Sequence, residues 1–413
     1  MNHQLHESPS AEGISKRIWG FVPNVFFLGL VSLLTDVSSE MIFTLVPLFL
    51  CNVLGAAATV VGLVGGLSES VDAIFRIFSG RLSDKLKKRK SLAVIGYSLS
   101  TIVKPFMYLA SNWGVVLAVR FGDRAGKGIR TSPRDALIAG SVSAGERGKS
   151  FGLHRTMDTS GAVIGLAVAA LIIYLVQKKS LELSLSTYQW LILVGVVPAI
   201  LAIIVLVIFV KEKHEKANTV AYGQSPAASD ISAKLDTRFK IFLAIMAVFT
   251  LGNSSDFFVI LRAQDLGSPV LYITLMLVLF NITYTVFSLP AGILSDRLGR
   301  KRVILLGWLV YALVYLGFAV ATSTWQIWLL FACYGIYYGI VEGVVRAFVA
   351  DMVPEEKRGT AYGLYYGVVG LTLLPASLIA GWLWDMVSPA APFYLGAGLA
   401  FMAMLGLMAL IRE

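Results

Sequence analysis

Twelve long apolar stretches, separated by short polar segments, constrain this chain more than any other feature of its sequence. A helix needs about 20 apolar residues to cross a hydrocarbon core about 30 Å thick. Because 57% of the residues are apolar and only 15% are charged, the sequence predicts an all-α membrane protein and not a soluble enzyme. Transmembrane helices are expected over residues 21–49, 58–80, 90–111, 113–141, 148–176, 187–210, 240–264, 269–294, 301–322, 324–352, 359–384 and 391–411.

The lysines and arginines outside these stretches lie almost entirely on one side of the predicted membrane. The two termini and the even-numbered loops together hold 23 of them, against about 3 in the opposite loops. Cytoplasmic loops carry the excess of positive charge in membrane proteins. Both termini are therefore expected to be cytoplasmic, and the pattern suits a multi-pass protein of a bacterial inner (plasma) membrane.

The longest polar stretch, Lys211–Lys240, divides the chain into two parts of similar size. It contains Ser, Ala, Asn and Gly with dispersed charges, a composition typical of a flexible linker. No other loop is long enough for a folded enzymatic domain. No cofactor or metal is expected, because Cys51 and Cys333 lie in no cluster of cysteines and histidines. The expected organisation is a cytoplasmic tail at 1–20, a six-helix bundle at 21–210, a cytoplasmic linker at 211–239 and a second six-helix bundle at 240–413.

Three short matches indicate that the two parts are internal repeats. Gly80–Lys85 (Gly-Arg-Leu-Ser-Asp-Lys) matches Gly292–Arg297 (Gly-Ile-Leu-Ser-Asp-Arg) at an offset of 212. Arg147–Leu153 matches Arg358–Leu364 at an offset of 211, and Ser38-Ser39-Glu40 matches Ser254-Ser255-Asp256 at an offset of 216. Matches in the same order and at nearly the same offset predict two bundles related by pseudo-two-fold symmetry.

These residues resemble the major facilitator superfamily, whose loop between helices 2 and 3 carries a G-x-L-x-D-R/K-x-G-R-R/K pattern that recurs between helices 8 and 9. The second copy, Gly292–Lys301, fits this pattern fully, whereas the first has Lys87 where glycine is usual. The resemblance covers essentially the whole chain and implies a transporter with a central site between its halves. A carboxylate near a helix end can accept hydrogen bonds from backbone N–H groups and pair with cations. A cytoplasmic gate is therefore expected from Gly80, Asp84, Arg134, Gly292, Asp296 and Arg300.

Charged residues also lie within the apolar stretches. Each would cost about 2–3 kcal/mol or more against lipid, so these side chains are expected to face partners or a wet cavity. The densest stretch is 113–141, where Arg120, Arg124 and Lys127 fall on one helical face. A central cavity with proton coupling is expected from Asp36, Glu40, Asp72, Arg120, Asp123, Arg124, Lys127 and Asp158.

Proton coupling needs a buried carboxylate whose ionisation depends on a neighbouring cation. Asp36 or Glu40 is expected to titrate, with Arg120, Arg124 or Lys127 as its partner. Arg120 also resembles the arginine of the superfamily's helix 4 motif, which implies a part in proton coupling, but Asp123 and Arg124 stand where that motif has Gln-Gly. The alternative is that these charges form static ion pairs that fix helix packing.

The second part is less charged and richer in tyrosine. Aromatic rings that carry a hydroxyl can hold an organic solute by stacking and hydrogen bonding. Other tyrosines are expected to be ordinary packing residues. The substrate cavity on this side is expected to comprise Asp256, Tyr284, Tyr338, Glu342 and Arg346.

The function expected from these features is secondary active transport of a small organic solute, driven by protons through alternating access. The basic residues of the first part favour an anionic or zwitterionic substrate, and no Walker-type ATP-binding motif occurs. Multidrug efflux by proton antiport is the alternative within the same class, and a non-transporting receptor or scaffold is the alternative outside it. Symport and antiport both stay open. The expected partners are the substrate, protons and the lipid bilayer, with no nucleic acid, and the protein is expected to be a monomer.

Overall fold

The computed structural model describes residues 17–86, 88–143, 146–178, 180–212, 236–354 and 358–411. The predicted tail at 1–20 is thus described only from Arg17, and the predicted linker at 211–239 only at its two ends. The side chain of Asp84, a predicted gate residue, also lies outside the described set. Every secondary-structure element of more than one residue in the described ranges is helical, which confirms the all-α prediction.

The first part of the chain contains six long helices. Two of the expected spans are interrupted: the first passes from α-helix through a short α-helical piece into a π-helix, and the third ends in a 3-10 helix. The elements are α1 (Pro23–Phe43), α2 (Val46–Leu48), the π-helix η1 (Phe49–Val53), α3 (Ala58–Leu86), α4 (Arg89–Val103), the 3-10 helix η2 (Lys104–Leu109), α5 (Trp113–Ser141), α6 (Arg147–Val176) and α7 (Leu185–Phe209).

The second part covers the other six expected spans, one of which is clearly broken. The expected span 240–264 is not one helix, because the chain leaves helical geometry between Asn253 and Asp256 and then resumes. The elements are α9 (Thr237–Gly252), α10 (Phe257–Asp265), α11 (Val270–Leu298), α12 (Arg300–Val320), α13 (Thr324–Asp351), α14 (Arg358–Met386) and α15 (Ala391–Leu410).

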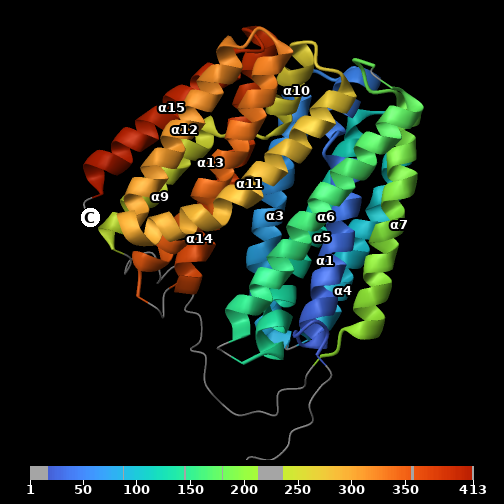
Figure 1. Cartoon of the computed structure of the whole chain (residues 1–413), viewed down its shortest axis with the longest axis vertical. Coiled ribbons are helices and arrows are strands. Elements are labelled where there is room, and N and C mark those ends of the chain that lie inside the picture. Colours follow the sequence, from blue (N-terminus) through green and yellow to red (C-terminus); the bar gives the residue numbers. More distant parts are fainter. Residues whose placement is uncertain are drawn as a thin grey trace, which may run out of the picture.

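Eleven helical segments in the described part of the chain are long and apolar enough to cross a membrane. The one expected span that is not among these eleven is 113–141, which forms α5. This helix has 29 residues, but it is too polar to count as a membrane span because it carries seven Asp, Arg and Lys residues. It nevertheless packs along α4 and α3 within the bundle (Figure 1). Its polarity therefore needs neighbouring protein or water, and not lipid, around it.

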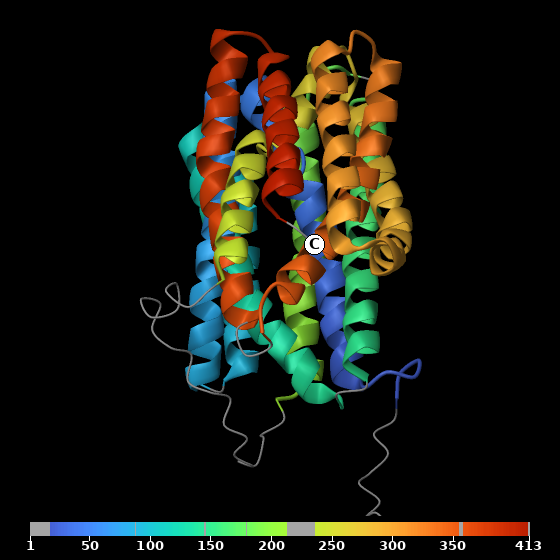
Figure 2. The same cartoon turned by 90° about the vertical axis from the view of Figure 1, so that its left-hand side faces the viewer.

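Figure 1 shows the helices in two groups, with α1 and α3–α7 on one side and α9–α15 on the other. Within each group the helices run beside one another along the long axis, as Figure 2 shows for the second group from its outer side. The main contacts between the two groups are those of α3 with α14 and of α6 with α11. We call these groups the N-terminal half and the C-terminal half.

Along the α3–α14 interface, the close contacts between the two halves run from one end to about the middle of the helices, where Ser70 donates a 2.6 Å hydrogen bond to the carbonyl oxygen of Gly370. We call the end where α7 stops and α9 starts the linker end, and the opposite end, where α10 lies in Figure 1, the far end. Near the far end a Cβ atom on Gly381 would lie 2.6 Å from the carbonyl oxygen of Ala58. Nearer the linker end, a Cβ atom on Gly363 of the same helix would meet nothing within 4 Å. The halves therefore pack tightly at the far end and separate toward the linker end.

Candidate functional site

A hydrogen-bonded bridge joins the two halves at the level of Arg155. This arginine lies on α6, and its Nη2 atom is 3.4 Å from Oε2 of Glu342 on α13. The hydroxyl of Tyr284 on α11 hydrogen-bonds both the guanidinium of Arg155 and the carboxylate of Glu342. On the other side, Glu342 pairs with Arg346 one turn along α13 at 2.8 Å. Two residues predicted for the C-terminal cavity, Tyr284 and Glu342, thus contact a basic residue of the N-terminal half, and a third, Arg346, pairs with Glu342.

The same arginine also contacts a pair of carboxyl groups in the N-terminal half. Arg155 Nη1 lies 3.2 Å from Oδ2 of Asp158, whose other oxygen accepts a hydrogen bond of 2.6 Å from the hydroxyl of Ser32 on α1. The carboxyl group of Asp36, one turn from Ser32, lies beside that of Asp158. Two ionised carboxylates repel each other, and only a protonated one can donate a hydrogen bond to the other, so the pair is suited to hold a proton. Asp36 and Asp158, which the sequence predicted for proton coupling, are therefore brought together.

The predicted cationic partner of Asp36 was one from helix 113–141. Lys127 of that helix acts on Asp36 electrostatically, whereas the group beside Asp36 is the carboxyl of Asp158. Glu40, the other candidate, accepts a 2.6 Å hydrogen bond from Thr44 on its own helix. The reason is geometric: α1 packs along the whole of α6, and the sequence alone gave no means of ranking α6 above α5 as its neighbour.

The basic face of α5 is divided between two environments. Arg124 pairs with Glu69 of α3 at 2.9 Å. Arg120 is only 2% exposed and lies 3.9 Å from Asp123, with its guanidinium 4.8 Å from the ring of Phe43. The guanidinium of Arg120 also lies 5.7 Å from the ring of Phe257 on α10 of the C-terminal half. Arg120 and Asp123 are thus buried and do not line open space in this conformation.

Lys127 differs from its neighbours on α5. It is half-buried, and it forms no ion pair within 4 Å with any residue that the structure describes. The expected Asp72, in contrast, is buried and pairs with Arg76 on its own helix at 2.6 Å. Among the cations predicted for the cavity, Lys127 is therefore the one whose charge is free to pair with an anionic group of a solute.

On the C-terminal side, Asp256 occupies the break between α9 and α10. Its carboxylate accepts a 2.6 Å hydrogen bond from the hydroxyl of Tyr334 and longer ones, at 3.2 and 3.3 Å, from that of Tyr338. Tyr338 and Tyr284 lie edge to face with ring centres 6.1 Å apart. Tyr334 itself is buried among other aromatic rings, so it is a packing residue that also holds the carboxylate.

Several of these charged side chains are open to solvent although they lie within the membrane-crossing segments. The side chain of Arg155 is 51% exposed and that of Glu342 is 38% exposed. Because Arg155 and Glu342 contact each other across the two halves, both side chains lie on inner faces of their helices and not on the outer surface. Exposed charges at this depth are stable only where water reaches them. The space between the halves is thus polar.

The predicted gate residues whose side chains the structure describes lie at the linker end and interact within their own halves. Arg300 pairs with Asp296 at 2.6 Å and with Asp351 at 3.4 Å. Arg134 pairs with the adjacent Asp135 at 2.9 Å. A Cβ atom on Gly292 would meet nothing within 4 Å, and one on Gly80 would meet only Ser132 of the same half.

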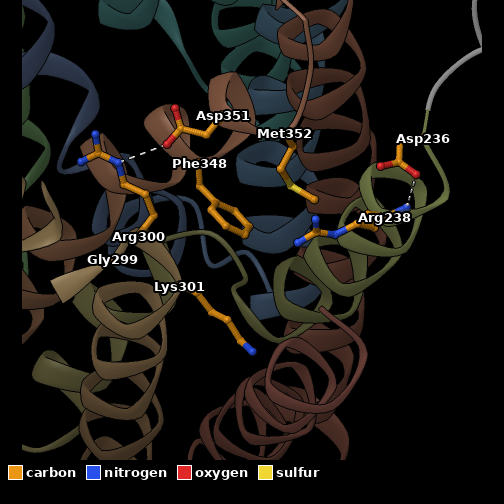
Figure 3. A pocket seen from close by; sticks show the side chains of 8 residues that line it. All are labelled: Asp236, Arg238, Gly299, Arg300, Lys301, Phe348, Asp351 and Met352. Atoms are coloured by element: carbon orange, nitrogen blue, oxygen red, sulfur yellow. Dashed lines mark hydrogen bonds and ion pairs between the residues drawn. The ribbon is translucent and has the colours of Figure 1, made fainter. Parts of the chain in front are cut away.

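Figure 3 shows the surroundings of Arg300. The guanidinium is directed toward Asp351, and the two line a cavity of about 290 Å³ together with Arg238, Lys301 and Phe348, among others. All these residues belong to the C-terminal half. Among the described residues, no group of three or more His, Cys, Asp or Glu side chains could hold a metal ion.

Sequence reasoning did not select Arg155 for the site. A signal existed in the spacing of Arg155 and Asp158, which places both on one helical face. Nothing in the sequence, however, places Arg155 opposite Glu342, because that contact depends on how the two halves dock.

The fold and this site define a class: a multi-pass membrane protein with ionised side chains enclosed between two groups of helices. A sequence profile of the Major Facilitator Superfamily matches residues 28–261 and 239–413, which together cover most of the chain. The chain belongs to the Major Facilitator Superfamily. The resemblance noted from the loop motifs is thereby confirmed.

Several of its relatives are transporters by name. An uncharacterized MFS-type transporter of Methanocaldococcus jannaschii is 41% identical over 386 residues, which cover 92% of this chain and 93% of the relative. A probable 4-methylmuconolactone transporter of Cupriavidus pinatubonensis is 23% identical and covers 76% of this chain and 72% of its own. Among solved structures, the nucleoside transporter NupG has the same fold with a TM-score of 0.76 at 15% identity, covering 94% of this chain and 99% of NupG.

Proposed function

We propose that this protein is a proton-coupled secondary active transporter of a small organic anion or zwitterion, and that it works by alternating access. The observation that carries the proposal is the pair of neighbouring carboxyl groups of Asp36 and Asp158, which can hold one proton and is connected through Arg155 to the opposite half. A proton site with a direct electrostatic link across the halves is what coupling requires. The remaining charged side chains between the halves would then bind the transported solute.

The coupling step follows from the charge on the pair. With one proton, Asp36 and Asp158 carry a single negative charge, and Arg155 divides its two ends between Asp158 and Glu342. Loss of that proton doubles the negative charge and draws Arg155, Lys127 and Arg134 toward the pair. The bridge to Glu342 then weakens, so protonation and the docking of the halves are linked.

The substrate class follows from the cations that remain available. Lys127 has no ion-pair partner within the described residues, and Arg346 adds a second exposed positive charge from the opposite half. A carboxylate or phosphate between the halves would meet Lys127. Tyr284 and Tyr338 offer aromatic faces and hydroxyls to the rest of an organic solute.

In the cell, we place the protein in the inner (plasma) membrane as a monomer with both termini in the cytoplasm, because the linker end carries the excess of lysine and arginine. The conformation described here, separated at the linker end, then corresponds to an inward-facing state. The two six-helix bundles at 21–210 and 240–413 would rock about the central site.

The test is substrate-induced proton movement in sealed proteoliposomes that contain a pH-sensitive dye. Organic anions and cationic drugs are screened with the parent protein and with Asp36→Asn, Asp158→Asn and Lys127→Ala. We expect flux with an anion, lost in both aspartate variants, and a raised half-saturation concentration in Lys127→Ala. Glu40→Gln is the matched control, since Glu40 lies one turn from Asp36 but bonds to Thr44.

Other outcomes point elsewhere. Proton flux that appears only with cationic drugs would favour multidrug efflux by antiport. Binding without any flux, in liposomes shown to be tight, would contradict proton coupling and favour a receptor. Equal loss in Glu40→Gln and Asp36→Asn would show that the pair with Asp158 is not the particular site of the proton.

A further inference from the structure

Helix α3 begins without a capping residue of its own. Four backbone N–H groups at the start of a helix lack partners within it, and a Ser, Thr, Asp or Asn at the preceding position usually satisfies one of them. Here the preceding residue is Ala57, whose side chain has no acceptor. The chain before it, Gly55-Ala56, offers none either.

The missing cap comes from the other half. Asp385, near the end of α14, accepts hydrogen bonds from the backbone N–H of Ala58 at 3.0 Å and of Thr59 at 2.8 Å. Its Oδ2 atom also accepts one from the hydroxyl of Thr59 at 2.6 Å. A carboxylate at this position also interacts favourably with the positive end of the helix dipole. Three bonds and one charge therefore join the halves at a single residue.

The second interface between the halves has a weaker version of the same arrangement. An offset of 212, that of the repeated Gly80 and Gly292 motifs, carries Ala58 to Val270, the first residue of α11. The N–H of Val270 donates to the carbonyl oxygen of Ser180 in the N-terminal half at 3.2 Å. The residue before it, Pro269, provides no side-chain cap. Both helix starts are thus capped by the opposite half, but only the cap of α3 is ionic.

Opening the far end must break the bonds of Asp385. Next to it, the backbones of α3 and α14 touch: a Cβ atom on Gly62 would lie 2.1 Å from the carbonyl oxygen of Ser377. Helices packed this closely cannot separate at that end while Thr59 keeps its bonds to Asp385. The motif carboxylate Asp296 lies at the linker end, so it cannot serve this purpose.

We propose that Asp385 is the latch of the far end, and that its capping of α3 across the halves sets how often that end opens. This inference rests on the proposed alternating access, but its geometry does not involve the proton or substrate sites. Loss of the cap removes stabilisation from the far-closed state alone, because in the far-open state water satisfies the same N–H groups. Asp385 is a positioning residue in transport and does not bind the solute.

The test measures the far-end opening directly. Spin labels are placed at Ser186→Cys on α7 and Trp325→Cys on α13, both exposed near the far end, after Cys51 and Cys333 are replaced by serine. Distances between the labels are measured by pulsed electron resonance in nanodiscs without substrate. Removal of a helix cap in Asp385→Ala is expected to raise the ratio of far-open to far-closed molecules about tenfold.

Two graded variants and one control accompany it. Asp385→Asn keeps an acceptor but no charge, and Thr59→Val removes one bond of the three, so both should give smaller shifts. Asp385→Glu should restore part of the closed population. Asp265→Asn removes a carboxylate near the same end that pairs within the C-terminal half, with Arg262 at 2.5 Å, and should leave the distances unchanged.

Unchanged distances in both Asp385→Ala and Thr59→Val would overturn the inference, as would an equal shift in Asp265→Asn. If Asp385→Ala does not fold, Asp385→Asn and Thr59→Val decide the matter. Because the readout needs no solute, a shifted distance in a protein that moves no protons would support the latch and count against the proposed function. The two failures are thus distinguishable.

Discussion

The carboxylate of Asp158 is contacted from two helices and at both oxygens. Ser32 holds one oxygen and Arg155 the other, while the carboxyl of Asp36 lies beside the group. These contacts fix the orientation of the Asp158 carboxyl, so the main change that the site can undergo is the gain or loss of one proton. At the scale of the residue, an Asp→Asn substitution replaces one carboxyl oxygen with nitrogen. It keeps the packing of the side chain and removes its ability to titrate.

The first prediction uses that change. Asp158→Asn keeps the size of the side chain and an acceptor for Ser32, but it cannot exchange a proton. We expect substrate-driven proton flux to fall to the level of empty liposomes, while exchange of labelled for unlabelled solute continues. Both rates are measured in the same proteoliposomes. Undiminished proton flux in this variant would exclude Asp158 from the coupling site.

The second prediction concerns the Arg155–Glu342 contact. Both side chains are substantially exposed, so the coupling between them should be about 0.2–1 kcal/mol, the range of solvated ion pairs. It is obtained from thermal unfolding of Arg155→Gln, Glu342→Gln and the double variant, as the part of the double effect that the single effects do not explain. When the same cycle is measured in a Tyr284→Phe background, which lacks the shared hydroxyl, the coupling energy between Arg155 and Glu342 should be smaller. Strictly additive effects would contradict a direct link between the halves at this point.

The amino-acid pattern predicted which residues are charged within the membrane far better than it predicted their partners. Asp36, Asp158 and Lys127 were identified as candidates because charge inside an apolar stretch is costly. Their pairing was not predictable, because α1 could pack against α5 or α6 with the same periodicity. Asp385 was missed for another reason: it lies just beyond the expected span 359–384, where polar residues are ordinary. The bond from Ser32 to Asp158 was missed because, like the pairing of the charges, it depends on α6 lying beside α1.

At the scale of whole elements, the prediction of helices succeeded because length and apolarity dominate in lipid. Breaks within helices were harder. Gly252-Asn253-Ser254-Ser255 combines residues of low helix propensity, which explains the interruption between α9 and α10. Residues 46–53 stay helical despite Pro47, as a short α-helix and a π-helix, because proline is tolerated in the first turn of a new helix. Neither break changes the number of crossings.

The third prediction concerns the contact of α3 with α14. In Gly381→Leu, the new side chain has no room, because its Cβ atom alone would lie 2.6 Å from backbone atoms of Ala58 and Thr59. Overpacking of this kind costs about 1–3 kcal/mol, and here it falls on the far-closed state. We expect a lower unfolding temperature and weaker transport.

The control for this substitution is Gly398→Leu on α15. Gly398 is exposed, and a Cβ atom there would meet nothing within 4 Å. The same change in propensity and apolarity is therefore made without a clash. An equal loss of stability and transport in both variants would show that the effect belongs to leucine in a helix and not to the interface.

At the scale of the whole molecule, the repeated motifs predicted the two parts and the superfamily, but not the conformation. The motif residues Gly80 and Gly292 lie at the linker end, where the halves are apart in this structure. Which end is closed depends on small differences in free energy between two dockings of the same helices. Those differences arise from contacts such as that of Asp385 with Thr59, which no motif marks.

The last prediction fixes the direction of the molecule in the membrane. Because lysine and arginine gather at the linker end, that end should face the cytoplasm. In intact cells, a membrane-impermeant maleimide should label Trp325→Cys at the far end and should not label Thr237→Cys at the linker end until the cells are opened. Both positions are exposed, so a difference in labelling reports sidedness. The reverse labelling pattern would show the opposite orientation in the membrane. The open linker end would then face outward, and Asp385 would close the cytoplasmic side.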